Sequence, residues 1–129
     1  MATSTVDNST CSVTRLKEIL VDPCQSQAFI DVRTGGEYKG SHISGVQNIP
    51  LSDIDKQAQR LGQYEEIYVS CHNGMRTKQA VKKLQAHGLN AIPVEGGIVA
   101  WRKAGFPLAE GKGGTISVMR QVQIIFGLL

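Results

Sequence analysis

The hydrophobic residues of this chain follow two patterns, one typical of strands and one typical of helices, and the order in which these patterns alternate predicts the fold class. Short apolar runs that are typical of buried strands cover residues 28–33, 46–49, 67–70 and 91–94. Between them, apolar residues recur every three or four positions, as on one face of a helix, over residues 13–20, 54–61, 76–87 and 97–101. Chains in which strands and helices alternate form parallel sheets that helices cover. We therefore expect an α/β fold with a mostly parallel sheet.

Residues that commonly begin or end helices and strands stand at the boundaries of these segments. Ser12 or Thr14 can cap the first helix, and Ser52 can cap the second. Gly62 stands where the second helix should end. Pro93 cannot donate a backbone hydrogen bond, so we expect the last strand to lie at an edge of the sheet or to end there.

The composition indicates one globular domain and excludes several classes of protein. The chain has 129 residues, of which 41% are hydrophobic and 19% charged, which is enough apolar material for a core. The net charge is only +3 and the Lys and Arg residues are dispersed, so we see no nucleic-acid-binding footprint. The N-terminus lacks the apolar stretch of a secretion signal, and we expect a cytoplasmic protein.

The three cysteines, Cys11, Cys24 and Cys71, match no zinc-binding spacing. We expect Cys11 and Cys24 to be plain residues. Either could resolve an oxidised Cys71 only if the fold brings it close, which the sequence does not show.

The stretch from Cys71 to Thr77, Cys-His-Asn-Gly-Met-Arg-Thr, is the strongest candidate for chemistry. It directly follows the strand over 67–70 and leads into a helix. Ligands of parallel sheets bind at the carboxyl ends of the strands. The backbone N–H groups of a short loop and of a helix N-terminus favour negative charge, so they stabilise a thiolate and bind an anionic substrate. Cys71 is therefore a candidate nucleophile, and the alternative is an inert buried cysteine.

Three blocks of the sequence resemble the signatures of single-domain rhodaneses, which are sulfurtransferases. The first block comprises 29–33, 37–38, 42–45 and 48–50; the second is 71–76; the third comprises 96–101 and 104–107. The blocks stand in the family's order and at its spacing over residues 13–108. The resemblance implies a three-layer α/β/α fold whose mostly parallel central sheet has about five strands.

The resemblance also implies a reaction, in which Cys71 is the nucleophile. Its thiolate attacks the outer sulfur of a donor such as thiosulfate, sulfite leaves, and the persulfide passes its sulfur to a thiol or to cyanide. Arg76 is then the cationic residue that faces the substrate. No metal or organic cofactor is required, because the N–H groups of the loop stabilise each anion in turn. The substrate-binding residues on this reading are His72, Asn73, Gly74, Met75, Arg76 and Thr77.

Two other functions stay open at this point. A rhodanese-like binding or regulatory module would be expected to lack the cysteine, which this chain has. The related cell-cycle phosphatases and some arsenate reductases have a loop that is one residue longer and therefore wider. The six residues from Cys71 through Arg76 favour a sulfur substrate over a tetrahedral phosphate or arsenate.

Several other residues have both a functional and a structural interpretation. Asp31 and Arg33 are charged residues at a strand end and are candidate supporting residues of the site, but such residues more often pair with each other or with the backbone. His72 stands where the family commonly has arginine, and it is either a base or a solvent-facing side chain. We expect His42 to be structural and Trp101 to lie in the core.

The two ends of the chain differ in composition from the domain at 12–108. We expect residues 1–11, rich in Ser and Thr, to be a flexible tail and residues 109–115 to be a linker. Residues 116–129 are strongly apolar but too short to cross a bilayer, which needs about 20 residues. They are either a docked terminal helix or, because they resemble the juxtamembrane start of membrane-anchored rhodaneses, the beginning of a membrane attachment that continues beyond Leu129. The chain as it stands is expected to be a monomer, facing the cytoplasm in either case.

Overall fold

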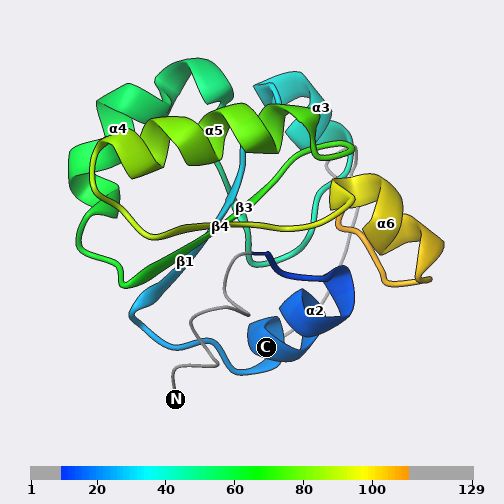
Figure 1. Ribbon diagram of the computed structural model, residues 1–129. Helices are drawn as coiled ribbons and strands as arrows, with labels where there is room; N and C mark the ends of the chain where they lie inside the picture. Colours follow the sequence, from blue (N-terminus) through cyan, green and yellow to red (C-terminus); the bar gives the residue numbers. More distant parts are fainter. Residues whose placement is uncertain (1–9, 111–129) are drawn as a thin grey trace, which may run out of the picture.

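A computed structural model describes residues 10–110, which form a three-layer α/β/α domain around a parallel sheet of order β2-β1-β3-β4. The strands are β1 (Gln27–Asp31), β2 (Gln47–Asn48), β3 (Glu66–Ser70) and β4 (Ala91–Pro93). The helices of the described residues are α2 (Val13–Val21), α3 (Gly35–Gly40), α4 (Ile54–Leu61), α5 (Met75–Ala86) and α6 (Gly97–Lys103), with a 3-10 turn, η1, at Leu51–Asp53. All strand pairings are parallel, so the predicted class and sheet type are confirmed. Figure 1 shows α4 and α5 on one side of the sheet and α2 on the other.

The alternation of side chains along the central strands builds two separate cores. In β3, Ile67 and Val69 face α4 and α5, and Cys71 continues this face just beyond the strand. Tyr68 faces the other way, toward α2 and α6, where its ring stacks on Phe29 of β1 with centroids 5.3 Å apart. Because successive side chains of a strand point to opposite faces, a sheet covered on both sides needs apolar residues at nearly every position. The unbroken apolar runs in the sequence reflect this double burial.

The described residues contain four strands where the resemblance predicted about five. The missing fifth strand is reduced to one parallel bridge between Cys11 and Val94. Cys11 N–H donates to the Pro93 carbonyl at 2.8 Å, and Glu95 N–H donates to the Cys11 carbonyl at 2.8 Å. Ser12 caps α2 directly afterwards, so the extended segment ends after one pair. Cys11 is buried against the domain, and the prediction of a flexible tail is therefore wrong at this residue; residues 1–9 lie outside the described part.

Of the residues predicted to begin or end helices, Ser12 and Gly62 are confirmed and Ser52 is not. Ser12 caps α2 by accepting the Arg15 N–H at 3.1 Å, and Gly62 ends α4. The prediction for Ser52 is wrong, because this residue lies inside η1 and α4 begins only at Ile54. Pro50 opens a tight 3-10 turn, closed by the Asp53 N–H on the Pro50 carbonyl at 2.8 Å, and this turn takes the place of a capped helix start.

The C-terminal boundary of the domain lies beyond its predicted end at residue 108. Ala109 and His42 exchange two backbone hydrogen bonds, of 2.7 and 2.8 Å, which tie the chain to the segment after α3. The rest of the predicted linker, 111–115, and the apolar segment 116–129 lie outside the described residues. None of the helices within residues 10–110 has the length and hydropathy needed to span a bilayer.

Candidate active site

Cys71 lies where the central strand ends and the site of a parallel sheet is expected. β3 pairs with β1 on one side and with β4 on the other, so the carboxyl ends of three strands meet there. The chain leaves β3 at Ser70 and enters α5 at Met75. The turn between them therefore lies at the N-terminal end of α5, where the helix dipole favours negative charge. Cys71 itself is fully buried in the core that α4 and α5 cover.

The backbone of the loop turns toward the Cys71 sulfur. Gly74 N–H donates to Cys71 Sγ at 3.0 Å. Gly74 has φ +102°, a left-handed conformation that side-chain-bearing residues rarely adopt, and this conformation closes the turn. The Asn73 side chain supports the turn, because its Oδ1 accepts the Met75 N–H at 3.2 Å. An N–H group aimed at the sulfur is the geometry that stabilises negative charge there.

Helix α6 holds the loop from outside. Ile98 N–H donates to the Cys71 carbonyl at 2.9 Å, and Val99 N–H donates to the His72 carbonyl at 3.0 Å. This close approach is possible only because residue 97 is glycine: a Cβ there would lie 2.2 Å from the Cys71 carbonyl oxygen. These two bonds fix the backbone at Cys71 and His72 in the orientation in which the Gly74 N–H faces the sulfur. The sequence predicted that Gly96-Gly97 opens a helix but not that Gly97 touches the nucleophile's own peptide group. The sequence signal for this contact is Gly97 itself, because a second glycine at the start of a helix indicates a close approach of backbone.

Arg76 reaches across to α3, where it pairs with Glu37. Its Nη1 lies 2.7 Å from Glu37 Oε1 and its Nη2 lies 3.0 Å from Oε2, so both terminal nitrogens are engaged. The hydrogen bonds from Arg76 lower the pKa of Glu37 to about 2. The pKa of Arg76 is raised, first by Glu37 and in smaller part by the charges of Cys71 and Asp31. The predicted cation is present, and its partner Glu37 was missed because it is 39 residues away in sequence.

Asp31 and Arg33 form a buried ion pair with each other. Arg33 Nη2 lies 2.8 Å from Asp31 Oδ2, and Arg33 Nε lies 3.0 and 3.1 Å from the two carboxylate oxygens. Arg33 Nη2 also donates to the Ser41 carbonyl at 2.6 Å. Removing one partner of a buried pair costs about 3–5 kcal/mol, because it leaves the other charge uncompensated. These contacts support the structural interpretation of both residues, which fix the end of β1 beside the site.

The remaining candidate residues divide into exposed and buried ones. The side chain of His72 is exposed and forms no hydrogen bond with the described residues, and Met75 is 66% exposed. Thr77 is buried, and its Oγ1 has no partner among residues 10–110. The structural interpretation of His42 is supported: its Nδ1 lies 2.8 Å from the Tyr38 carbonyl oxygen, and its ring stacks on the Tyr38 ring.

The other two cysteines do not join the site. Cys11 belongs to the core on the α2 side of the sheet, whereas Cys71 belongs to the opposite core, and Cys24 is exposed. All three are free thiols. Trp101 lies in the same core as Cys11, as predicted, and its Nε1 donates to the Pro107 carbonyl at 2.8 Å. Within the described part of the chain, no group of His, Cys, Asp and Glu side chains is arranged to hold a metal ion.

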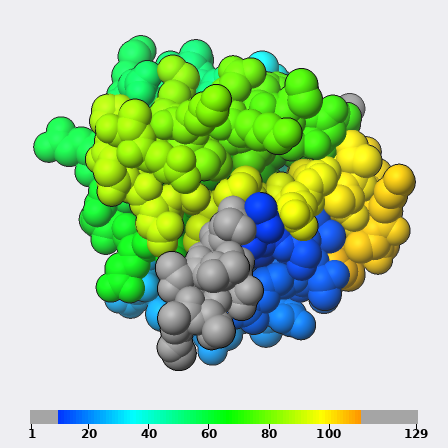
Figure 2. All heavy atoms as spheres, in the orientation of Figure 1, coloured from blue at the N-terminus to red at the C-terminus, as the bar shows by residue number. Residues whose placement is uncertain are grey.

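A pocket of about 280 Å³ opens beside the loop, between the start of α5 and the end of β4. Its residues come from the loop, α5, the end of β4 and the connection to α6, and Thr10 adds the start of the described chain. The space-filling view shows the first described residues, in blue, beside the yellow segment that joins β4 to α6 (Figure 2).

The fold and the cysteine loop together define a class: parallel α/β domains with a free cysteine at the carboxyl end of a central strand. Residues 12–104 match the rhodanese-like domain family, so the chain belongs to this family. The uncharacterized protein slr1261 of Synechocystis is 33% identical over 100% of this chain and 72% of that protein. The putative sulfurtransferase YtwF of Bacillus subtilis is 31% identical over 70% of this chain and 86% of that protein. A solved rhodanese-related protein from Thermoplasma volcanium has a TM-score of 0.68 and 30% identity over 78% of this chain and 96% of that one.

Proposed function

We propose that this protein is a sulfurtransferase that takes a sulfane sulfur from thiosulfate onto Cys71 and passes it to a thiol or to cyanide. The observation that carries the proposal is the loop that joins β3 to α5, in which the Gly74 N–H points at Cys71 Sγ from 3.0 Å. Membership of the rhodanese-like family and a relative named as a putative sulfurtransferase support the class of reaction.

The proposed reaction has two displacement steps that balance without an oxidant. The Cys71 thiolate attacks the outer sulfur of thiosulfate, and the S–S electron pair leaves with sulfite, so that Cys71 carries a persulfide. The acceptor thiolate or cyanide then attacks the terminal sulfur, and Cys71 departs as a thiolate. Each intermediate carries negative charge at the same place, where the Gly74 N–H and the N-terminus of α5 favour it.

The length of the loop favours a sulfane-sulfur donor over a phosphate or arsenate substrate. The loop has six residues from Cys71 through Arg76, one fewer than in the related phosphatases. The cytoplasmic location, the monomeric state and the membrane attachment beyond Leu129 stay predictions from the sequence.

The decisive experiment is intact mass spectrometry after incubation with thiosulfate, on the parent protein and on Cys71→Ser. We expect the parent to gain one sulfur atom, Cys71→Ser to gain none, and cyanide to remove the sulfur as thiocyanate. Cys24→Ser is the matched control, because it removes an exposed thiol but leaves the loop intact. A folded parent without an adduct would refute the proposal and favour a binding module. Assays with phosphate esters and with arsenate would then distinguish a binding module from a phosphatase or an arsenate reductase.

A further inference from the structure

The charge of Arg76, the cation of the loop, is already matched by a carboxylate before any substrate binds. Glu37 engages both terminal nitrogens of Arg76, at 2.7 and 3.0 Å. The two side chains are 33% and 38% exposed, so water and a small anion can reach the pair. Exposed pairs of this kind are weak, which means that a donor can compete for Arg76 but must do so against Glu37.

Glu37 is held in place by its own helix. The Glu37 Oε1 accepts hydrogen bonds from the Thr34 N–H at 3.0 Å and from the Thr34 hydroxyl at 3.2 Å, which completes a capping box at the start of α3. A long side chain on a surface would normally sample many positions. Here the capping box and the Arg76 pair restrict the carboxylate from two sides, so its negative charge stays beside the loop.

The second arginine near the site does not supply a free cation either. Arg33 is buried against Asp31 and the Ser41 carbonyl. The charge of Arg76 is thus offset by Glu37, while the backbone N–H groups of the loop and the start of α5 attract an anionic donor in addition. Coulomb energy is proportional to the charge of the ligand, so Glu37 repels a dianion twice as strongly as a monoanion at the same position.

We propose that Glu37 determines donor specificity: by offsetting the charge of Arg76, it disfavours dianionic sulfane-sulfur donors such as thiosulfate relative to monoanionic donors of the same shape. The inference rests on the proposed function, because it concerns the donor of the Cys71 reaction. It names monoanionic thiosulfonates and persulfides as the class of donor for which the site is better matched.

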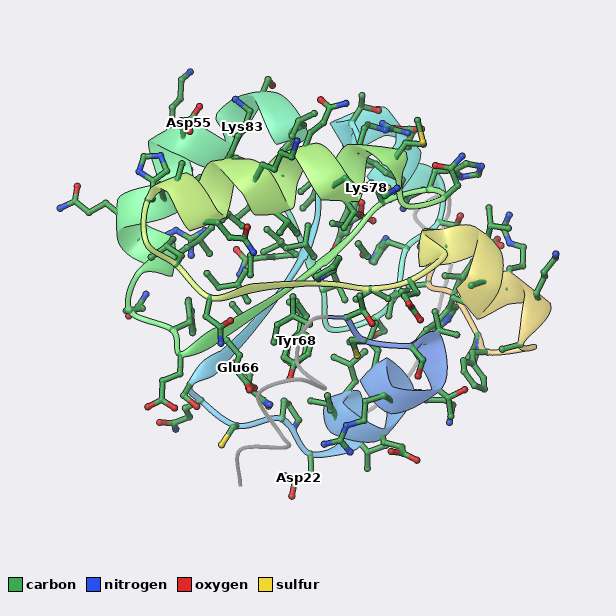
Figure 3. All side chains as sticks on the ribbon, in the orientation of Figure 1. Asp22, Asp55, Glu66, Tyr68, Lys78 and Lys83 are labelled. Atoms are coloured by element: carbon green, nitrogen blue, oxygen red, sulfur yellow. The ribbon has the colours of Figure 1, made fainter. Side chains whose placement is uncertain are left out.

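A matched pair of donors and a matched pair of variants test this proposal. Thiosulfate and methanethiosulfonate both present an outer sulfur on a tetrahedral sulfur, but the second has a methyl group in place of one charged oxygen. Glu37→Gln removes the charge and keeps a side chain that can complete a capping box, so α3 is preserved. Asp55→Asn is the control, since Asp55 pairs with Lys83 at 3.1 Å and with His87 at 3.0 Å. In Figure 3, Lys83 lies farther along α5 than Lys78, which follows the loop, and Asp55 lies near Lys83 on the neighbouring helix α4.

The first measurement is kcat/KM for persulfide formation with each donor. We expect Glu37→Gln to raise the value for thiosulfate by roughly fivefold and the value for methanethiosulfonate by about the square root of that factor. The value for thiosulfate divided by the value for methanethiosulfonate should rise in Glu37→Gln and remain unchanged in Asp55→Asn. At high salt, this ratio in Glu37→Gln should fall back toward that of the parent. An equal change with both donors, or no change, would overturn the proposal, because damage to α3 alone cannot distinguish donor charge.

The second measurement separates this inference from the proposed function. Calorimetry on Cys71→Ser, with and without Glu37→Gln, gives the affinities for the two donors when no sulfur can be transferred. A rise in the relative affinity for thiosulfate supports the role of Glu37 whether or not the parent forms a persulfide, and an unchanged relative affinity contradicts it. If the folded parent forms a persulfide with neither thiosulfate nor methanethiosulfonate, the proposed function is refuted instead.

Discussion

Gly97→Ala tests whether α6 positions the nucleophile, because Gly97 is the closest point between the two. Its φ is +55°, in the left-handed region, where a side-chain-bearing residue pays roughly 1–2 kcal/mol. The added Cβ would also lie 2.2 Å from the Cys71 carbonyl oxygen and 2.8 Å from that of His72. Since ordinary contact begins at about 3.4 Å, the loop or α6 must move by roughly 1.2 Å.

The displacement falls on the peptide group of Cys71, so we expect the rate of persulfide formation to fall together with the stability. A misplacement of about 1 Å in reacting groups can cost about 10²-fold in rate. We therefore expect Gly97→Ala to slow persulfide formation by about 10²-fold and to lower the free energy of unfolding by about 2–3 kcal/mol. The rate is measured by the time course of intact mass with thiosulfate, and the stability by urea denaturation.

Gly88→Ala provides the control for the backbone cost alone. Gly88 has φ +79°, and its added Cβ would meet nothing within 4 Å among the described residues. This variant should lose roughly 1 kcal/mol of stability and keep the parent rate of persulfide formation. A parent-like rate in Gly97→Ala, or an equal loss of rate in Gly88→Ala, would refute the argument that α6 holds the loop.

Three further predictions concern packing, thiol chemistry and acid stability. Leu84→Ala should lower the free energy of unfolding by about 2–5 kcal/mol, because Leu84 is fully buried. Val21 is 79% exposed, so Val21→Ala should change the free energy of unfolding by less than about 0.5 kcal/mol. Equal effects of the two substitutions in urea denaturation would be inconsistent with the observed core. Burial raises the pKa of Cys11 to about 11, so iodoacetamide at pH 8 should alkylate Cys24 and spare Cys11; peptide mapping that finds both equally modified would contradict this. Because the pKa of Cys11 is higher in the folded state, its contribution to the free energy of unfolding is full below pH 9 and is lost as the pH rises through 11. The ion pair with Arg76 lowers the pKa of Glu37 from 4.5 to about 2, so the contribution of Glu37 to stability is present above pH 4.5 and lost as the pH falls toward 2. Glu37→Gln should therefore lose less free energy of unfolding than the parent between pH 5 and pH 3. Equal losses in the two proteins would argue against the pair.

Much of the fold follows from short-range patterns in the sequence. The apolar run of β3, the helical period of α5 and the caps at Ser12 and Gly62 are properties of neighbouring residues, so they were predictable. The prediction failed where local preference was overruled by nearby geometry. Ser52 is a good capping residue by type, but the 3-10 turn after Pro50 leaves it no helix start to cap.

The sequence by itself determined the α/β class and singled out Cys71 and its loop as the candidate site, because these depend on residues that are adjacent in the chain. Only the tertiary structure decided what holds that loop. Glu37 meets Arg76 across 39 residues, and the start of α6 meets the Cys71 carbonyl, because the parallel sheet gathers the carboxyl ends of its strands at one edge. Contacts between such distant segments have no period or spacing in the sequence, so the charge balance and the rigidity of the site become visible only once the chain is folded.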